Sequence, residues 1–355
     1  MDTIQNNKKN DFLIGKKKSS KIEIIKNPIL LLIVCLLIFE VIFLFNCLPI
    51  NIWNKKEIKN RGLSDVNFKL SNVLNSENYS FKAIYFTSSE NQLVSLFNDT
   101  YTKDIIEISL DNEKIPISST YTFPNPGNHT LYFKMNSPST NSLSYLFNST
   151  KQLLSISFSS NFNTENVIDM KNMFYNCISL LSVENLSNLN TKNVIDMSQL
   201  FLGCSNLTSI DLSGLNTENV KFMSYLFMGC GKLNSVNINI NTKNVISMFY
   251  MFGGCRSLRS IDLSKLDTQN VKEMSYMFEG SGFYKLNLST FNTKNLVNAS
   301  YMFSSMDSLE ELDISGFDTS NAINMNAMFY YCTKLTSLDV SSFNTENAQK
   351  NGLYV

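Results

Sequence analysis

Alternating apolar and polar residues recur along the second half of the chain and predict short β-strands. In residues 207–213, Ile210 and Leu212 alternate with small polar side chains. Because alternate positions of a strand face opposite sides, these two side chains face a core and Asp211 faces outward. Farther along the same unit, apolar residues within 220–227 are spaced three, three and one apart. This spacing gathers them on one side of a helix and predicts a short α-helix of about two turns.

The two patterns return together as a repeat that extends from about Leu153 to the C-terminal end. The helix pattern contains a phenylalanine that recurs every 25 to 27 residues, at Phe174, Phe201, Phe227, Phe252, Phe278, Phe303 and Phe329. A period in the twenties is typical of a solenoid, whose units bury their apolar faces only by stacking. We therefore predict an α/β solenoid of the leucine-rich-repeat type, with one parallel sheet and short helices opposite it.

A polar motif, Asn/Asp-Thr-x-Asn, lies between the strand and helix patterns of every unit, first at residues 163–166. Such side chains satisfy the unpaired N–H groups of a turn and of a helix start. A Ca²⁺ site would need several carboxylates around one loop, but six of the eight first positions are neutral Asn. The motif is therefore expected to cap turns and not to bind metal.

Residues 29–48 predict a transmembrane helix. Sixteen of these twenty residues are Leu, Ile, Val or Phe, and this length crosses the hydrocarbon core of a bilayer. Glu40, near the centre, costs about 2.5 to 3.5 kcal/mol, whereas the apolar residues contribute about −5 to −10 kcal/mol. The lipid bilayer is thus a predicted partner of residues 29–48.

A cleaved signal peptide is the competing interpretation of this segment. The apolar core is longer than the usual 7 to 15 or so residues, and no small-x-small cleavage site follows it. The leader, residues 1–26, holds seven Lys and outnumbers the basic cluster after the span, so the N-terminus is expected to stay in the cytoplasm. We predict an uncleaved single-pass signal anchor with the C-terminal repeats extracellular.

Composition divides the chain into five predicted regions. They are a Lys-rich cytoplasmic tail (1–27), the signal anchor (28–49), a polar stalk (50–78), a small β-sandwich-like domain (79–140) and the repeats (141–355). Residues 144–147 copy 224–227, so the first repeat is expected to be a degenerate copy that caps the stack. Acidic and basic residues number 30 each. The sequence has no basic patch of the kind that would indicate nucleic-acid binding.

Candidate catalytic chemistry is scarce. His129 is the only histidine, and the chain has no phosphate-binding glycine loop and no Cys-x-x-Cys. We predict no enzyme, no cofactor and no metal site. Five cysteines follow a repeat Phe by three residues, at Cys177, Cys204, Cys230, Cys255 and Cys332. Stacking would allow disulfides between neighbours, but the odd number, with Ser281 and Met306 at the same position, favours buried thiols.

Two surfaces remain as candidate binding sites. The outward face of the strands carries a row of polar residues at Asp211, Asn237, Asp262, Asn287, Asp313 and Asp339. A stripe of tyrosines, Tyr225, Tyr250, Tyr276 and Tyr301, precedes the repeat Phe by two residues. That offset is about half a helical turn from the core-facing side, so the stripe faces outward. Copying of the repeat alone would also produce such a stripe.

Eight Asn-x-Ser/Thr sequons lie beyond the predicted span and would be glycosylation acceptors in an extracellular chain. They are Asn78, Asn98, Asn128, Asn148, Asn185, Asn206, Asn287 and Asn298. A chain this rich in Asn, Ser and Thr gives a similar number by chance.

The repeated phrases carry a family resemblance. Leu-Thr-Ser-Ile-Asp-Leu-Ser, Asn-Thr-x-Asn-Val and Met-Ser-Tyr-Met-Phe-x-x-Cys, over about residues 141–347, resemble the BspA-like leucine-rich-repeat surface proteins of bacteria and protists. They also resemble the repeat of unknown function in mycoplasma surface lipoproteins. The resemblance implies a cell-surface protein, in some members an adhesin for host or matrix proteins, and transfers no catalytic residue. The chain departs from it in its N-terminal anchor, since many relatives use a cleaved signal or a lipid.

Together these features predict a membrane-anchored cell-surface protein for adhesion or recognition through non-catalytic contacts with an extracellular protein or glycan. The alternative is a structural coat or antigenic display protein without a defined ligand. A signalling receptor is disfavoured because residues 1–27 are too few to form a signalling domain.

Overall fold

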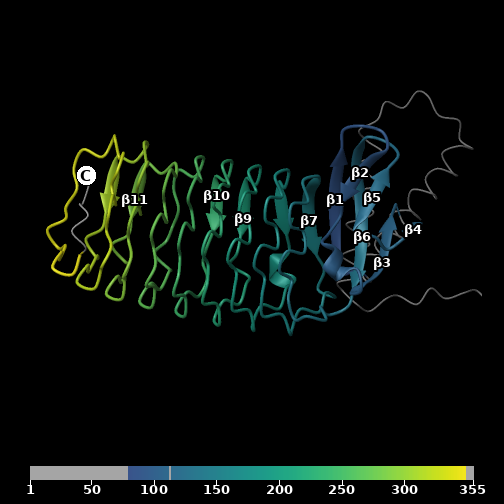
Figure 1. Ribbon diagram of the computed structural model, residues 1–355, viewed down its shortest axis with the longest axis horizontal. Coiled ribbons are helices and arrows are strands. Elements are labelled where there is room, and N and C mark those ends of the chain that lie inside the picture. Colours follow the sequence, from purple (N-terminus) through teal and green to yellow (C-terminus); the bar gives the residue numbers. More distant parts are fainter. Residues whose placement is uncertain (1–78, 112, 349–355) are drawn as a thin grey trace, which may run out of the picture. The chain divides into compact units, whose positions relative to one another are not determined.

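The computed structural model describes residues 79–111 and 113–348, which form a set of mostly antiparallel strands followed by stacked repeats (Figure 1). The strands are β1 (Phe81–Thr87), β2 (Gln92–Ser95), β3 (Ile105–Leu110), β4 (Glu113–Ile115), β5 (Thr120–Phe123), β6 (Gly127–Met135), β7 (Leu153–Phe158), β8 (Ser182–Glu184), β9 (Ser209–Asp211), β10 (Ser235–Asn237), β11 (Lys285–Asn287) and β12 (Glu311–Asp313). Two short 3₁₀ turns, η1 (Asp99–Tyr101) and η2 (Leu186–Asn188), complete the described elements.

One sheet joins the antiparallel region to the repeats. Its strand order is β4-β3-β6-β1-β7-β8, and β2 pairs with β5 separately. β1 is antiparallel to both β6 and β7, whereas β7 and β8 are parallel. The sheet therefore changes from antiparallel pairing to the parallel pairing of the repeats at β7.

The repeats stack in parallel, each beside the next. Short parallel pairs, β9 with β10 and β11 with β12, place corresponding residues opposite one another. Isolated parallel bridges continue the register from Ser142 with Asp169 to Asn298 with Asn324. Corresponding positions of successive repeats consequently form columns along the stack.

An aromatic column occupies the centre of the core. Its rings are stacked, with neighbouring centroids 5.4 to 5.9 Å apart, at Phe147, Phe174, Phe201, Phe227, Phe252, Phe278, Phe303 and Phe329. On the strand side, Ile210 is buried and lies opposite Val236, which packs against the same core with Ile261. The predicted inward direction of these strand residues is confirmed.

The predicted helices are absent from the described residues, so the α/β solenoid with one continuous parallel sheet is wrong. Residues 220–227 belong to a run of turns and form no α-helix. In it, the N–H groups of Met223, Tyr225, Phe227 and Gly229 donate to carbonyls of the next repeat at 2.6 to 3.1 Å. In an α-helix these N–H groups would donate to carbonyls of the same helix. Here they donate to the neighbouring repeat instead.

Left-handed backbone within these turns also excludes a helix. Tyr225 and Gly229 have φ of 59° and 75°, values that end a right-handed helix at once. The strand side is likewise shorter than predicted, because β9 to β12 hold three residues each and form two separate pairs. The stack is therefore built from turns and short strands.

The predicted membrane topology also needs correction. Across residues 79–111 and 113–348, no helix is long and apolar enough to cross a bilayer. The predicted tail, anchor and stalk (1–78) lie outside the described residues, so the structure gives the single-pass localisation no support.

Candidate functional site

The four tyrosines of the predicted stripe form one continuous stack, which we call the tyrosine ladder (Tyr225, Tyr250, Tyr276 and Tyr301). Successive ring centroids are 5.6, 4.5 and 4.7 Å apart, and the rings are within 7° of parallel. All four side chains are partly exposed. The structure thus brings the predicted residues together in a single row on the surface.

Each ladder tyrosine occupies a left-handed backbone position, with φ between 53° and 59°. Such a conformation costs a bulky residue about 1 to 3 kcal/mol. In other repeats the same position holds Asn172 (φ 58°), Gln199 (φ 60°) and Ala327 (φ 51°). Gly253 makes room for the ladder, because a Cβ there would collide with the ring of Tyr250. Ring stacking at about 0.5 to 1.5 kcal/mol per pair offsets part of the strain.

Three ladder hydroxyl groups, those of Tyr225, Tyr250 and Tyr276, remain protonated at neutral pH. Burial, followed by the nearby Glu279 carboxylate and the neighbouring rings, raises the pKa of Tyr250 to about 12. Burial also raises the pKa of Tyr225 and Tyr276. These three tyrosines therefore present aromatic edges and neutral hydroxyl groups, a combination suited to protein or glycan contacts.

Two residues beside the ladder were missed by sequence reasoning. The Phe249 ring packs edge-on against Tyr225 and Tyr250, with centroids 4.8 and 5.0 Å away. Glu279 lies near the ladder, and burial raises the pKa of its carboxyl while Arg256 opposes that shift. The available signal was the local sequence at 248–251, where Phe replaces the Ser found before Tyr225, Tyr276 and Tyr301.

The predicted polar row is exposed, but its side chains already form hydrogen bonds within the fold. In every member Oδ1 accepts the N–H two residues ahead, at 2.9 to 3.4 Å, in Asp211, Asn237, Asp262, Asn287, Asp313 and Asp339. This is the geometry of an Asx-turn, which ends the strand segment. The structure pairs Asp211 with Asn237 and Asn287 with Asp313.

Hydrogen bonds from serines also favour the ionised form of two carboxyl groups of this row, Asp262 and Asp313. The hydroxyl and N–H of Ser264 hold the pKa of Asp262 below its ordinary value, and Ser315 does the same for Asp313. In the described residues no group of His, Cys, Asp and Glu is arranged to hold a metal ion. The row is better described as a series of turn caps than as a free binding surface.

The Asn/Asp-Thr-x-Asn motif clamps successive repeats together. Thr268 Oγ1 donates to the carbonyl of Asn292 at 3.1 Å and accepts its N–H at 2.8 Å. Asn270 Nδ2 donates backward to the carbonyl of Lys243 at 2.7 Å. The first residue of the motif also caps its own turn, as expected, since Asp267 Oδ1 accepts the N–H of Gln269 at 3.0 Å. The motif therefore caps a turn and in addition binds both neighbouring repeats.

The repeat cysteines are free thiols in the described part of the chain. Each Sγ donates to the carbonyl of the Phe in the preceding repeat, at 3.0 to 3.2 Å, in Cys177, Cys204, Cys230, Cys255 and Cys332. Burial raises the pKa of Cys230 to about 12 and that of the half-buried Cys332 to about 11. They act as small core residues with one weak hydrogen bond.

Several predicted sequons use their asparagine side chains in the fold. Asn98 Oδ1 caps η1 by accepting the N–H of Thr100, and Asn298 Nδ2 donates to Glu273 Oε2 at 3.0 Å. Asn128 is exposed, whereas Asn78 lies outside the described residues. A glycan on Asn298 would replace a hydrogen bond between repeats.

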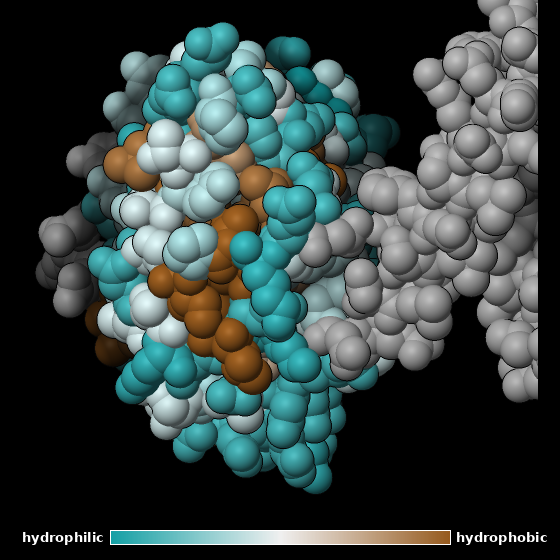
Figure 2. Space-filling model, turned by 90° about the vertical axis from the view of Figure 1, so that its right-hand side faces the viewer, coloured by the Kyte–Doolittle hydropathy of each residue, from teal (hydrophilic) through white to brown (hydrophobic). Residues whose placement is uncertain are grey.

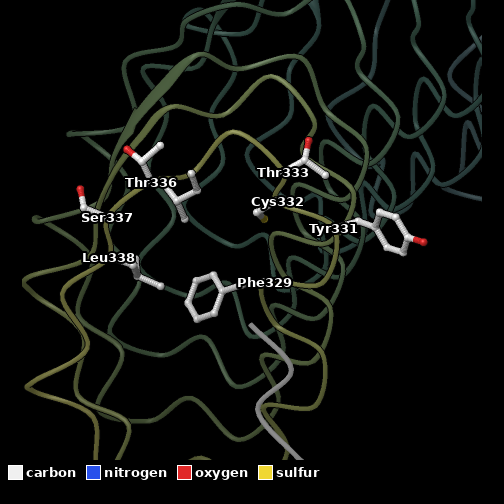
Figure 3. Close-up of a pocket in the computed structure, with 8 residues that line it drawn as sticks. Phe329, Tyr331, Cys332, Thr333, Thr336, Ser337 and Leu338 are labelled. Carbon is white, nitrogen blue, oxygen red and sulfur yellow. The ribbon is translucent and has the colours of Figure 1, made fainter.

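A hollow of about 460 Å³ marks the last described repeat (Figure 3). Phe329 and Leu338 point toward one another in it, whereas Tyr331 points away. Because residues 349–355 follow this repeat and lie outside the described residues, the hollow is the end of the described stack.

The antiparallel region carries an apolar patch at the opposite end (Figure 2). The exposed large apolar residues of this region are Phe86, Leu93, Ile106 and Ile117. They are candidates for a contact surface, and nothing in the described residues shows what covers them.

The comparisons with known proteins point to one family. Residues 141–261 and 250–353 match the model of the family described as Mycoplasma protein of unknown function, DUF285. No curated protein matches the chain. The match covers the stacked repeats, including all four residues of the tyrosine ladder.

Proposed function

The chain belongs to the Mycoplasma family of unknown function DUF285, and from its repeat surface we propose a non-catalytic recognition protein that contacts a protein or glycan through the tyrosine ladder. The observation that carries the proposal is the stacked row of Tyr225, Tyr250, Tyr276 and Tyr301. Tyrosine is enriched where binding energy concentrates, because one end of its side chain is apolar and the other is polar.

The backbone supports a binding role for these tyrosines. Other repeats fold with Asn172 or Ala327 at the same position, so the fold does not require tyrosine there. Asparagine also adopts left-handed backbone at lower cost than an aromatic residue. Four consecutive repeats nevertheless carry a strained tyrosine there. Strain at a surface position is a reason to infer function from the outlier.

A ladder of this kind favours extended ligands. The rings stack face to face, so a ligand meets their edges and hydroxyl groups, repeated at the spacing of the repeats. Repetition allows several weak contacts to add along one ligand. The resemblance to BspA-like surface proteins adds support, and we propose adhesion as the finer form of this recognition.

The test compares the full chain with the double variant Tyr250→Asn/Tyr276→Asn. Asparagine matches the residue that the stack already accepts at Asn172, so the variant keeps the fold. Asp262→Asn is the control, because it removes a charge from the polar row and keeps the Asx-turn. Binding is measured to immobilised matrix proteins and to a glycan array.

We expect saturable binding to at least one probe, weakened at least about tenfold in the ladder variant and unchanged in the control. Two lost tyrosine anchors at more than about 1 kcal/mol each account for this factor. If no probe binds saturably, the structural coat or antigenic display role is favoured instead. Equal binding by the ladder variant would remove the ladder from recognition.

A further inference from the structure

A polar notch interrupts the stack where one repeat is a residue shorter than its neighbour. The segment from the repeat Phe to the polar row spans 252–262 in one repeat and 278–287 in the next. Gly282 closes the shorter loop, and its N–H donates to the carbonyl of Cys255 at 3.1 Å. A Cβ at this position would collide with the carbonyl of Arg256, so the close approach requires glycine.

The notch is a hollow of about 560 Å³ with a polar lining. Arg256 and Arg259 come from the repeat before the shortening, Glu279 from the shortened repeat and Asp307 from the repeat after it. A space of this size is within the range of small-molecule sites, about 300 to 1,000 Å³. Its four charged side chains are gathered from three successive repeats.

The guanidinium groups of the notch retain free hydrogen-bonding capacity. The two ion pairs of the described residues lie elsewhere, so Arg256 forms none there. Arg259 is held in place because Nη1 donates to the carbonyl of Gly282 at 2.8 Å and the group lies 4.9 Å from the centroid of the Tyr284 ring. Its other N–H groups have no protein partner among the described residues.

The charges of the notch select the class of ligand. Two guanidinium groups and two carboxylates balance, so the notch has no net attraction for a strongly charged molecule. Charged donors and acceptors stand close together, and a sugar hydroxyl both donates and accepts a hydrogen bond. The guanidinium of Arg259 covers the Tyr284 ring, so recognition relies on hydrogen bonds.

We propose that this notch is a binding site for a neutral saccharide of about disaccharide size. Arg256 and Arg259 donate to sugar oxygens, and Glu279 and Asp307 accept from sugar hydroxyls. This assigns a second site, which adjoins the tyrosine ladder at Glu279 but contains none of the four ladder tyrosines. Binding of a saccharide in the notch does not depend on whether the ladder binds a ligand.

The experiment is saturation-transfer NMR on the full chain with lactose, maltose, cellobiose and, as an anionic comparison, sialyllactose. The variants are Arg256→Gln and Asp307→Asn, whose side chains are exposed, so neither change disturbs the core. Lys232→Gln, at an exposed position of the repeat before Arg256, is the matched control. Circular dichroism checks that every variant is folded.

We expect saturable binding of at least one neutral disaccharide, weakened about tenfold or more by Arg256→Gln and by Asp307→Asn. Lys232→Gln should bind as the unchanged chain does. Absence of binding by all three neutral disaccharides would overturn the proposal. So would binding that both notch variants retain, or tighter binding of sialyllactose than of lactose.

Discussion

Replacing one clamp threonine by valine should destabilise the stack according to the number of hydrogen bonds that the threonine makes between repeats. Thr268 makes two bonds, since Oγ1 donates to the Asn292 carbonyl at 3.1 Å and accepts its N–H at 2.8 Å. Thr242, one repeat earlier, makes one bond, to the Asp267 carbonyl at 2.9 Å. Both side chains are 1% exposed.

The expected magnitudes follow from these contacts. Valine has nearly the shape of threonine, so Thr268→Val leaves no cavity and removes only the hydroxyl. Each lost hydrogen bond lowers the free energy of unfolding by about 1 kcal/mol. The loss is larger where the former partner stays buried without contact to water. We therefore expect a loss of about 2 kcal/mol for Thr268→Val and about 1 kcal/mol for Thr242→Val.

Two measurements separate this explanation from a general loss of packing. Urea unfolding followed by circular dichroism gives the free energy of unfolding of each variant, and the two sites are one repeat apart, so they report on the same part of the stack. Hydrogen exchange then examines the Asn292 amide, which should exchange faster in Thr268→Val. The Asp267 amide has no bond to Thr242 and should be unchanged in Thr242→Val.

Equal losses of unfolding free energy in Thr242→Val and Thr268→Val would refute a dependence on the number of hydrogen bonds. So would an Asn292 amide that kept its protection without the hydroxyl. Either result would mean that the number of threonine hydrogen bonds between repeats does not set the stability of the stack.

Three further predictions concern other columns of the stack. Phe252→Ala should lower the free energy of unfolding by about 3 to 5 kcal/mol in urea, because it interrupts the central aromatic column. Native Cys230 should resist iodoacetamide at pH 8, with Cys332 alkylated first by mass-spectrometric mapping, because burial raises their pKa to about 12 and about 11. The raised pKa of Tyr250, about 12, favours the neutral hydroxyl in the fold. Its stabilising contribution is complete below the unfolded value near 10 and is lost as pH rises toward 12. Absorbance at 295 nm against pH should show late ionisation, and Tyr250→Asn should reduce the amplitude of that late phase.

The strand side of each repeat was predictable because alternation is a local property. Ile210 and Val236 alternate with polar residues in sequence and lie side by side facing the core. The polar row lies on the outer face, as predicted, but the sequence analysis did not identify its role in Asx-turns. The signal was the residue two positions ahead, since Ser213 and Ser264 follow Asp211 and Asp262 and donate their N–H groups to them.

The turn side was not predictable from apolar spacing. Apolar residues three apart within 220–227 suit one side of an α-helix and suit successive turns equally well. The choice depends on where the N–H groups go, and Phe227 donates to Met251 in the next repeat. That partner is a contact between repeats, which local sequence does not contain. Gly229, with φ of 75°, was the local sign of a turn.

The tyrosine ladder likewise depends on contacts between repeats. An outward stripe was expected from a helix, and the tyrosines are outward for a different reason. Left-handed backbone at Tyr225 and Tyr250 turns their side chains away from the core that holds Phe227 and Phe252. The residues could be named in advance, whereas their stacking and strain depend on the register between repeats.

The direction of these hydrogen bonds gives the stack two different ends. In the turns, N–H groups of one repeat point to the next repeat, and carbonyls point to the preceding one, as in Tyr225 donating to Phe249. A first repeat must therefore present carbonyls that have no repeat in front of them. Buried carbonyls without partners are costly, so a stack of this kind requires donors from the region that precedes it.

The antiparallel region supplies those donors. The Tyr101 hydroxyl donates to the carbonyls of Ser142 and Ser144 at 3.2 and 2.7 Å, and the N–H of Asn98 donates to the carbonyl of Leu146 at 2.8 Å. Burial, as the main cause, raises the pKa of Tyr101 to about 12, which keeps the hydroxyl a donor throughout the neutral range. The antiparallel region is thus suited to precede the first repeat. Its side-chain and backbone donors bind the carbonyls of that repeat, which a preceding repeat would otherwise bind.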